Sequence, residues 1–264
     1  MISVKDIDVK HLARAVYAAR NAMNSWDKSD SDIKNDILGK NDLKLAQNLF
    51  DAGPSHRKYL RQVAVIMDIT APLYWWKEAD TYKIGTVSDS CSTMHKIAAK
   101  EFTFEDFSCE HLNERSMKAL GEVIKNLNYN RDKFLETNDK QYWWQMIQLL
   151  PSTYNQLRTF SCSYENIANI LDQRSAHKLD EWRELCNILK TLPYVEDIMC
   201  REKPVRAVCF HCMKPTVIWQ NDFTFEDMGY EGEGIVNVCK CANCGADIEY
   251  AVRFDDEEDD GNET

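Results

Sequence analysis

Apolar residues recur every three or four positions through much of the first 200 residues, a spacing that is typical of amphipathic helices. The run VKHLARAVYAARNAM, at residues 9–23, shows this spacing and predicts a first helix. In NDLKLAQNLFDAG, Asn41 has the chemistry of an N-cap and Gly53 that of a C-terminal stop, which predicts a second helix. The same pattern predicts further helices over residues 113–127, 131–150, 164–174 and 177–190.

Strand patterns are fewer and fall in two places. Residues 60–69, LRQVAVIMDI, are apolar and β-branched and predict a buried strand, and Pro72 suits the first turn of the helix that follows. Beyond Lys203, alternating runs such as VIW, IVNV and IEYAV predict a small β-rich module. We therefore expect an α+β fold with a long helical layer in residues 1–203, a second module in residues 204–254 and a tail over residues 255–264.

Charge is concentrated at the end of the chain. The net charge of −11 includes seven acidic residues in DDEEDDGNET, at residues 255–264, which leaves 36 acids against 32 bases in the remainder. The tail is typical of a solvated, disordered segment. Few basic residues lie in or next to the β-rich module, and together with the acidic tail this scarcity argues against a nucleic-acid partner; these residues are Lys203, Arg206, Lys214 and Lys240. A DNA-mimicking role for the acidic tail is an alternative, but the composition of the tail does not favour it.

No apolar run has the length of a signal-peptide core or of a membrane span. We therefore expect an intracellular, cytoplasmic protein with no membrane partner. The ten cysteines then argue for metal binding or free thiols, because a reducing compartment disfavours disulfides.

Four of the cysteines form two C-x-x-C pairs separated by 28 residues: Cys209, Cys212, Cys241 and Cys244. Each pair directs two thiolates at one ion, and two pairs complete a tetrahedral shell, so the spacing predicts a structural zinc ion in a zinc ribbon. A closed shell of four cysteines offers no position to a substrate. Cys239 and His211 are spare candidate ligands. Coincidence or redox chemistry would be the alternative explanations of the pairs.

Two short features raise questions that the pattern alone leaves open. The stretch DTYKIGTVSDSCSTMHK, at residues 80–96, is rich in hydroxyl groups and is either a solvated loop or a binding loop. The octapeptide EFTFEDFS at residues 101–108 is echoed by DFTFEDMG at residues 222–229, which indicates coincidence or a shared turn rather than a repeat architecture.

The most informative segment spans residues 149–189. On its own, it shows a polar stripe that is typical of the solvated face of an amphipathic helix: Asn166, Asn169, Gln173 and His177. As a whole, however, it resembles the C-terminal half of the flavin-dependent thymidylate synthases. The residues that match this family's pattern are Leu150, Pro151, Asn169, Arg174, His177 and Glu181. In the order of its elements the resemblance extends over residues 5–195.

This resemblance implies a homotetramer with flavin and nucleotide sites between subunits. It implies a reaction in which a folate supplies a methylene group and reduced FAD supplies hydride, converting dUMP to dTMP without a cysteine nucleophile. Arg174 would be the catalytic residue that contacts the pyrimidine carbonyl, where a fixed guanidinium stabilises negative charge on the ring. Asn169 and His177 would contact the flavin.

The chain departs from the family's pattern after the helix that begins at Ala71-Pro72. In place of the family's Arg-His-Arg triplet and the serine that follows it, the chain has Thr81, Tyr82, Lys83 and Cys91. By position, the nucleotide-binding candidates are Glu78, Lys83, Asp89, Cys91 and Arg174. The cofactor-binding candidates are Tyr82, Lys83, Asn169, His177 and Gln62. Candidate replacements for the lost cations are the polar groups of residues 85–92, and Arg57, Arg61 and Arg158.

Three functions are compatible with these observations. The first is a divergent enzyme of this family that acts on a pyrimidine deoxynucleotide, by reductive methylation or a related one-carbon transfer at C5 with folate and FAD. The second is a non-catalytic nucleotide-binding or scaffold protein on the same fold, because the Arg-His-Arg motif is replaced. The third is an adaptor in which the zinc ribbon contacts a partner.

Overall fold

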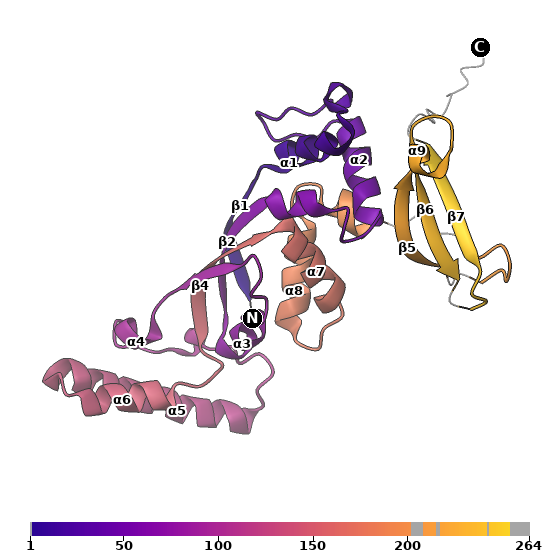
Figure 1. Cartoon of the computed structure of the whole chain (residues 1–264). Coiled ribbons are helices and arrows are strands. Elements are labelled where there is room, and N and C mark those ends of the chain that lie inside the picture. The colour runs from indigo at the N-terminus through magenta and orange to yellow at the C-terminus, as the bar shows by residue number, and fades with distance from the viewer. Residues whose placement is uncertain (1, 202–207, 215–216, 242, 254–264) are drawn as a thin grey trace, which may run out of the picture. The chain divides into compact units, whose positions relative to one another are not determined.

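The computed structural model of the chain describes residues 2–201, 208–214, 217–241 and 243–253. The chain divides into two compact units, residues 1–201 and residues 202–264, whose elements are drawn in Figure 1. The predicted acidic tail lies outside the described residues. Across the described parts of the chain, no helix combines the length and the apolar character that a bilayer span requires.

A four-stranded antiparallel sheet forms the centre of the first unit. Its strands, in the order β1-β2-β4-β3, are β1 (Ser3–Lys10), β2 (Ala64–Pro72), β4 (Asn155–Ser163) and β3 (Val87–Ser90). Alternate residues of β2 point to a buried face, and these are Val65, Met67, Ile69 and Ala71. The strand predicted at residues 60–69 is confirmed from Ala64 onward, whereas the preceding residues form the 3₁₀ helix η3 (Lys58–Gln62).

The first helix begins later than the sequence pattern predicts, because its expected start belongs to β1. This edge strand carries charged residues that hide its alternation, and its pairing with β2 is irregular between Lys5 and Asp8. His11 then adopts a left-handed conformation with a φ of 76°, and α1 (Leu12–Ala19) and η1 (Arg20–Met23) follow. The helix predicted over residues 9–23 is therefore correct only from residue 12.

Helix α2 (Lys40–Asp51) already includes Asn41, so the prediction that Asn41 is its N-cap is wrong. The start of the helix is capped from outside, because Asp30 accepts hydrogen bonds from the backbone N–H groups of Asn41 and Asp42 at 2.9 and 3.1 Å. The predicted stop is confirmed. Gly53 follows the helix with a φ of 106°, a conformation that glycine adopts without strain.

Three helices pack on the buried face of the sheet: α3 (Leu73–Ala79), α7 (Tyr164–Arg174) and α8 (Asp180–Lys190). Pro72 precedes α3 as its N-cap. Their largest buried side chains meet in one core that includes Trp75, Trp76, Tyr164 and Trp182. Helix α7 has the predicted bounds, whereas α8 begins three residues later than predicted.

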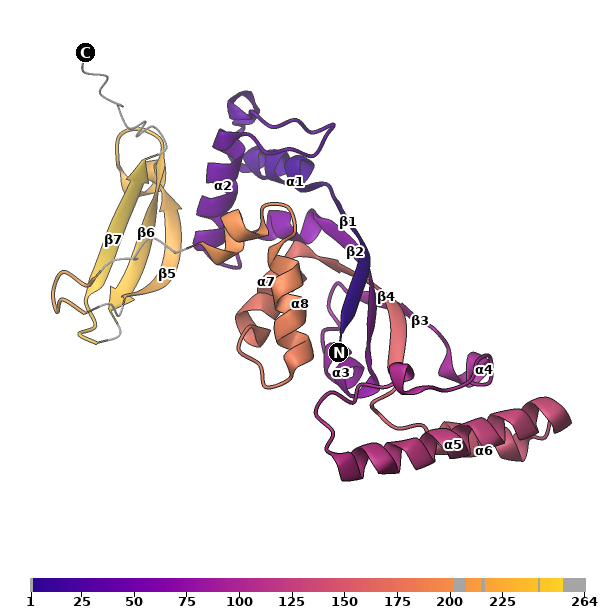
Figure 2. The ribbon, with the colours of Figure 1, turned by 180° about the vertical axis from the view of Figure 1, so that it is seen from behind.

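Helices α5 (Glu114–Thr137) and α6 (Lys140–Leu149) lie side by side as a hairpin in Figure 2 and share a smaller, separate core. The chain turns at Asn138, which has a φ of 54°, and Asp139 caps α6. The predicted break between residues 127 and 131 is wrong, because that stretch continues α5. The remaining short helical turns of this unit are η2 (Trp26–Lys28), α4 (Thr93–Lys96), η4 (Phe104–Asp106) and the π-helix η5 (Glu196–Cys200).

The second unit contains a three-stranded antiparallel sheet in the order β5-β6-β7, which confirms the β-rich pattern. Its elements are β5 (Val217–Thr224), α9 (Phe225–Met228), β6 (Gly234–Cys241) and β7 (Asp247–Arg253). The echoed octapeptides adopt a shared turn. In the first unit Thr103 and Asp106 form a reciprocal capping box, and Thr224 and Asp227 form the same box here.

Candidate functional site

Glu78, near the end of α3, lies together with three other predicted site residues: Tyr82, Arg174 and His177. The Oε2 atom of Glu78 accepts a hydrogen bond from Trp182 Nε1 at 2.9 Å and lies 3.6 Å from Arg174 Nη1 and 3.5 Å from His177 Nε2. Arg174 Nε donates to the hydroxyl of Tyr82 at 3.0 Å. We refer to this group as the Glu78 cluster: Glu78, Tyr82, Arg174, His177 and Trp182.

The guanidinium of Arg174 is held by two aromatic rings. Its Cζ atom lies 5.0 Å from the ring centre of Trp182 and 5.6 Å from that of Tyr82. Contacts of this kind gain strength where water is partly excluded, and the Arg174 side chain is 22% exposed. Arg174 is therefore fixed in position while part of its side chain still faces solvent.

The imidazole of His177 has one ring nitrogen engaged by the backbone. Nδ1 accepts a hydrogen bond from the N–H of Leu179 at 3.2 Å. In the neutral ring the proton then lies on Nε2, which faces Glu78. The turn that holds His177 in this position occupies residues 175–179, which explains why α8 begins only at residue 180.

The hydroxyl-rich loop is attached along α7 at two points. Near the end of α7, the hydroxyl of Tyr82 donates to Gln173 at 3.0 Å. Near its start, Asn166 Nδ2 donates to the carbonyl of Ile84 at 2.8 Å. The Oδ1 atom of Asn166 also accepts from the backbone N–H of Ser163 at 3.0 Å, as part of the capping box of α7. The loop therefore has a definite position, with the Glu78 cluster at one end.

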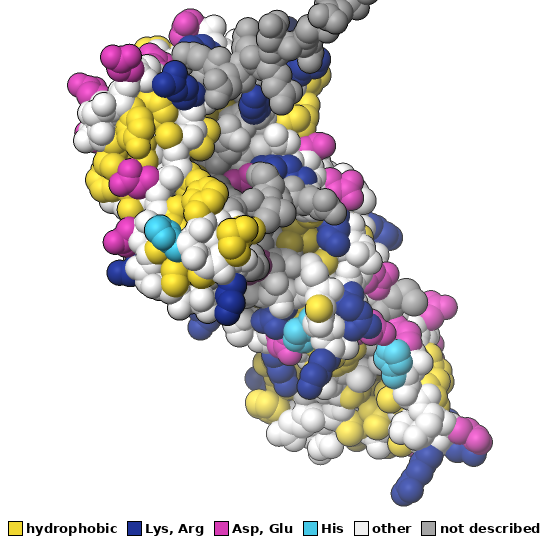
Figure 3. Space-filling view, turned by 90° about the vertical axis from the view of Figure 1, so that its right-hand side faces the viewer, with side chains coloured by type: hydrophobic (Ala, Val, Ile, Leu, Met, Phe, Trp, Pro, Cys, Tyr) yellow, Lys and Arg dark blue, Asp and Glu magenta, His cyan; other side chains and the backbone are white. Residues whose placement is uncertain are grey.

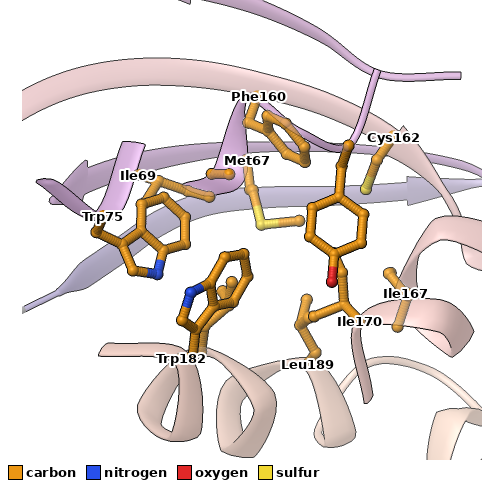
Figure 4. A pocket seen from close by; sticks show the side chains of 12 residues that line it. Met67, Ile69, Trp75, Phe160, Cys162, Ile167, Ile170, Trp182 and Leu189 are labelled. Carbon is orange, nitrogen blue, oxygen red and sulfur yellow. The ribbon is translucent and has the colours of Figure 1, made fainter. Parts of the chain in front are cut away.

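Apolar side chains beneath the cluster enclose a packing cavity of about 10 Å³. Figure 4 shows Trp75, Trp182 and Leu189 around this space, together with Met67 and Phe160. A space of this size is close to the minimum that one water molecule needs, so it does not admit a ring-shaped ligand. A ligand of the Glu78 cluster must approach from solvent.

The other five candidates do not join the Glu78 cluster. Asn169 accepts a hydrogen bond from Arg57 Nη2 at 3.2 Å, nearer the start of α7. The backbone N–H of Cys91 donates to the carbonyl of Leu157 at 2.9 Å, beyond the end of β3. The exposed candidates are Gln62, Lys83, Asp89 and Cys91.

Two of the three arginines considered as replacement cations are paired with carboxylates. Arg57 Nη2 lies 3.0 Å from Glu165, and Arg158 Nη1 lies 2.8 Å from Asp80. The guanidinium of Arg158 also stacks 4.4 Å from the ring centre of Trp76. The third, Arg61, is exposed.

These acidic partners were not identified from the sequence. Glu165 is 108 residues from Arg57 along the chain, and Asp80 is 78 residues from Arg158, so no local pattern joins them. The sequence offers one acidic partner in advance, because Glu78 is among its nucleotide-binding candidates and pairs with Arg174.

A second carboxylate, Glu181, is buried in the first turn of α8 and is 6% exposed. It accepts a hydrogen bond from the hydroxyl of Tyr74 in α3. Burial raises the pKa of Tyr74, and the bond to Glu181 raises it further. Tyr74 therefore remains a protonated donor that ties α3 to α8, the two helices that position Glu78 and Trp182.

The second unit brings the four predicted metal ligands together. The Sγ atoms of Cys209, Cys212, Cys241 and Cys244 all lie within 4.8 Å of one another. Two of the sulfur–sulfur distances are 3.6 Å. A tetrahedral zinc ion with Zn–S bonds of about 2.3 Å needs sulfur atoms about 3.8 Å apart, so the arrangement fits this ion. Of the two spare candidates, Cys239 is buried and His211 is exposed.

Comparison with known proteins bears on the fold. No family model and no curated protein matches the sequence. Among solved structures, the flavin-dependent thymidylate synthase ThyX from Helicobacter pylori, in complex with FAD and dUMP, matches with a TM-score of 0.54 and 19% identity. The match covers 75% of this chain and 96% of that one. Over the matched part of the chain, the fold is similar to that of a flavin-dependent thymidylate synthase.

A second structure of the Helicobacter pylori enzyme with FAD and dUMP, at 2.31 Å resolution, has the same TM-score and identity and is covered over 97% of its length. The expected thymidylate synthase-like fold is thus shown for the matched part of the chain. At 19% identity the likeness concerns the backbone, so the chemistry of this chain is argued from its own residues.

Proposed function

We propose that the chain binds a pyrimidine ring at the Glu78 cluster. Among the described residues, the polar contacts of the Glu78 carboxylate fall on Oε2, which leaves Oε1 to accept from a ring N–H. Arg174 uses its Nε atom for Tyr82 and keeps Nη groups that can donate to a carbonyl. The imide edge of a uracil-type ring has an N–H between two carbonyls. One observation carries the proposal: the Glu78 carboxylate, as acceptor, and the Arg174 guanidinium, as donor, are fixed side by side and open to solvent.

The first candidate function is a divergent thymidylate synthase-like enzyme that transfers a one-carbon unit to C5 of a pyrimidine deoxynucleotide. The thymidylate synthase fold supports it, as do the dUMP and FAD in the Helicobacter pylori structures. A guanidinium at a ring carbonyl stabilises negative charge in the ring, which makes C5 more nucleophilic. A folate and reduced FAD would supply the methylene group and the hydride.

The described residues fit the phosphates of FAD poorly. Arg57, Arg158 and Arg174, which could meet such phosphates, each face a carboxylate. This pairing favours the second candidate, a non-catalytic protein of the same fold that binds a ring ligand or serves as a scaffold.

Titration calorimetry of the full-length protein with 2′-deoxyuridine and with dUMP tests ring binding. Arg174→Ala is expected to weaken binding at least tenfold, whereas Lys83→Ala, which removes an exposed cation of the neighbouring loop, should change it less than twofold. Equal affinities of R174A and wild type contradict the proposal. Turnover of dUMP with reduced FAD and methylene-folate supports the enzyme, and ring binding without turnover supports the second candidate.

We also propose that the four cysteines hold one structural zinc ion in a zinc ribbon. The mutual distances of their sulfur atoms support the proposal, because all four can reach a single ion. With four protein ligands the ion has no open position for a substrate, so its role would be to stabilise the second unit.

A homotetramer is proposed from the resemblance to the thymidylate synthase family. The Glu78 cluster faces solvent in a single chain, so a second subunit is a reasonable source of the remaining ligand contacts. Sedimentation equilibrium is expected to give four times the chain mass of 30.7 kDa. A concentration-independent monomer would contradict this assembly.

A further inference from the structure

The hydroxyl group of Tyr250, in β7, is enclosed within the second unit. The residue as a whole is half-buried, but its hydroxyl oxygen is buried and forms no hydrogen bond with any of the described residues. Removing a hydroxyl from water without replacing its hydrogen bonds costs free energy. Native proteins therefore give such a group a partner, and the surroundings of Tyr250 indicate which one.

The ring of Tyr250 lies beside the cysteine cluster. It packs against the small buried core of the second unit: Cys209, Cys239, Cys241 and Ile248. Along the sheet, Tyr250 is opposite Asn237 in β6, two residues before Cys239. Its ring centre is 6.1 Å from that of Phe210, the residue that follows Cys209. Two independent segments, β6 and the first C-x-x-C turn, thus place sulfur atoms around this side chain.

Cys209 is the acceptor that suits this hydroxyl. Burial raises the pKa of Tyr250, and the charged forms of Cys239 and Cys209 raise it further, so both sulfur atoms are close enough to act on the phenol. Cys239 is not one of the four proposed ligands, and its thiol points at the carbonyl of Asn237, at 4.0 Å. A zinc-bound Cys209 is a thiolate, which accepts hydrogen bonds and has none to donate. A hydroxyl is the complementary donor.

The loaded site also needs such a donor, because four thiolates outweigh the charge of one zinc ion and the site is an anion. The described residues of the second unit include three basic residues against seven acidic ones, so their net charge does not offset it. On the face of the molecule shown in Figure 3, basic and acidic side chains are likewise interspersed. A dipole directed at one thiolate stabilises the anion locally.

We propose that the hydroxyl of Tyr250 donates a hydrogen bond to the zinc-bound thiolate of Cys209 and thereby slows release of the metal. The proposal rests on the zinc site proposed above and adds a partner outside its four ligands. Tyr250 acts through Cys209, so it is a positioning residue and not a ligand.

The first test compares two phenylalanine variants of the full-length, zinc-loaded protein. Tyr250→Phe removes the hydroxyl and keeps the ring that packs against Phe210. Tyr230→Phe is the matched control, because it removes a phenol hydroxyl of the same unit whose partner is Glu249, at 3.5 Å. Transfer of zinc to a chromophoric chelator is expected to be roughly tenfold faster in Y250F and unchanged in Y230F. Equal release rates of Y250F and wild type would overturn the proposal.

Cobalt(II) in place of zinc gives a readout that a merely structural role of Tyr250 would not move. A thiolate that loses a hydrogen bond holds its electrons less tightly, so its charge-transfer bands to cobalt shift to longer wavelength. We expect this shift in Y250F and not in Y230F, while the d–d bands continue to report tetrahedral geometry. Unchanged charge-transfer bands in Y250F, or the same shift in both variants, contradict a bond from Tyr250 to Cys209.

Wild-type protein loaded with cadmium-113 tests the bond without any substitution, should Y250F not fold. The hydroxyl proton of Tyr250 is expected to show a nuclear spin coupling to the metal through the sulfur of Cys209. A hydroxyl proton with no such coupling overturns the proposal. If the protein binds none of these metals, the zinc site itself is wrong. If metal binds and Y250F behaves as wild type, only the role of Tyr250 is refuted.

Discussion

At the scale of single residues, Arg20 and Asp42 show how a polar contact sets local structure inside an apolar core. Their side chains are 6% and 0% exposed, and Arg20 Nε lies 2.6 Å from Asp42 Oδ1. The other carboxylate oxygen accepts from Ser29 at 2.6 Å and also from Ser31. Asp42 is therefore fully engaged, and it fastens the preceding loop to α2.

Asp42→Ala is expected to lower the free energy of unfolding by about 3–5 kcal/mol, because it leaves the charge of Arg20 buried without its partner. Urea denaturation followed by circular dichroism measures the change. Lys118→Gln is the control, since it breaks an exposed pair with Glu114 and should have little effect. Similar stabilities of the two variants would count against a structural role for the buried pair.

Cys162 gives a pH-dependent prediction. Burial raises the pKa of its thiol from the ordinary 9.0 to about 12. Its contribution to stability is therefore full below about pH 9 and is lost as the pH rises from 9 towards 12, where the unfolded chain ionises first. At pH 8.5 iodoacetamide should alkylate the exposed Cys91 well before Cys162, as followed by peptide mass spectrometry. Equal rates in the native protein would contradict this.

At the scale of elements, the sequence predicts what local signals determine. The bounds of α7 follow from its own residues, since Ser163 and Asn166 form a capping box at its start. Strand β3 is different, because its four residues are all exposed and show no alternation. Its pairing with β4 alone defines it. The sequence misplaces the turn between α5 and α6, because Asn128, Asn130 and Arg131 interrupt the apolar pattern although the helix continues, and the left-handed Asn138 gives only a weak local signal.

In the candidate site, too, some features follow from local sequence and others depend on the complete fold. The cysteine pairs are visible as a spacing, and the family resemblance selects residues that the fold brings to Glu78. The ion pairs that neutralise Arg57 and Arg158 join residues 108 and 78 positions apart, so they depend on the complete fold. What the sequence could not supply was therefore the charge balance of the site.

Asn166 links two elements, and one substitution separates its roles. Asn166→Asp keeps an oxygen for the capping box of α7 but removes the N–H that donates to Ile84. Hydrogen exchange of residues 82–86 should become faster, while the melting temperature changes little because a carboxylate suits a helix N-terminus. Asn166→Ala, which removes both contacts, is the comparison and should lower stability as well. Unchanged exchange in N166D would show that the side chain does not fasten the loop.

At the scale of the whole molecule, the two units differ in the source of their stability. The first unit has an extended apolar core around three tryptophans and a tyrosine: Trp75, Trp76, Trp182 and Tyr164. The second unit has a much smaller buried cluster, in which three of the four buried residues are cysteines. The small size of this cluster among the described residues accords with the structural zinc ion proposed above, because small units with little core rely on metal ions or cross-links.

Removal of metal is accordingly expected to affect the second unit selectively. The purified protein should contain one zinc ion per chain by mass spectrometry, and Cys212→Ser should lose it whereas Cys91→Ser keeps it. On chelation, backbone exchange should accelerate in β5, β6 and β7 while β2 and α7 stay protected. Metal-free protein with an equally protected second unit would contradict a structural zinc ion.

The indole of Trp182 has a practical consequence. It donates to Glu78, lies under the guanidinium of Arg174 and packs 4.7 Å from the ring of Trp75. Indole emission responds to nearby charge, so a molecule that engages either charged group will shift the fluorescence of the protein. Trp182→Phe identifies that signal among the seven tryptophans of the chain. Trp182 is therefore an intrinsic fluorescent reporter of binding at the Glu78 cluster, and unlabelled compounds can be screened by the change that they cause in its emission.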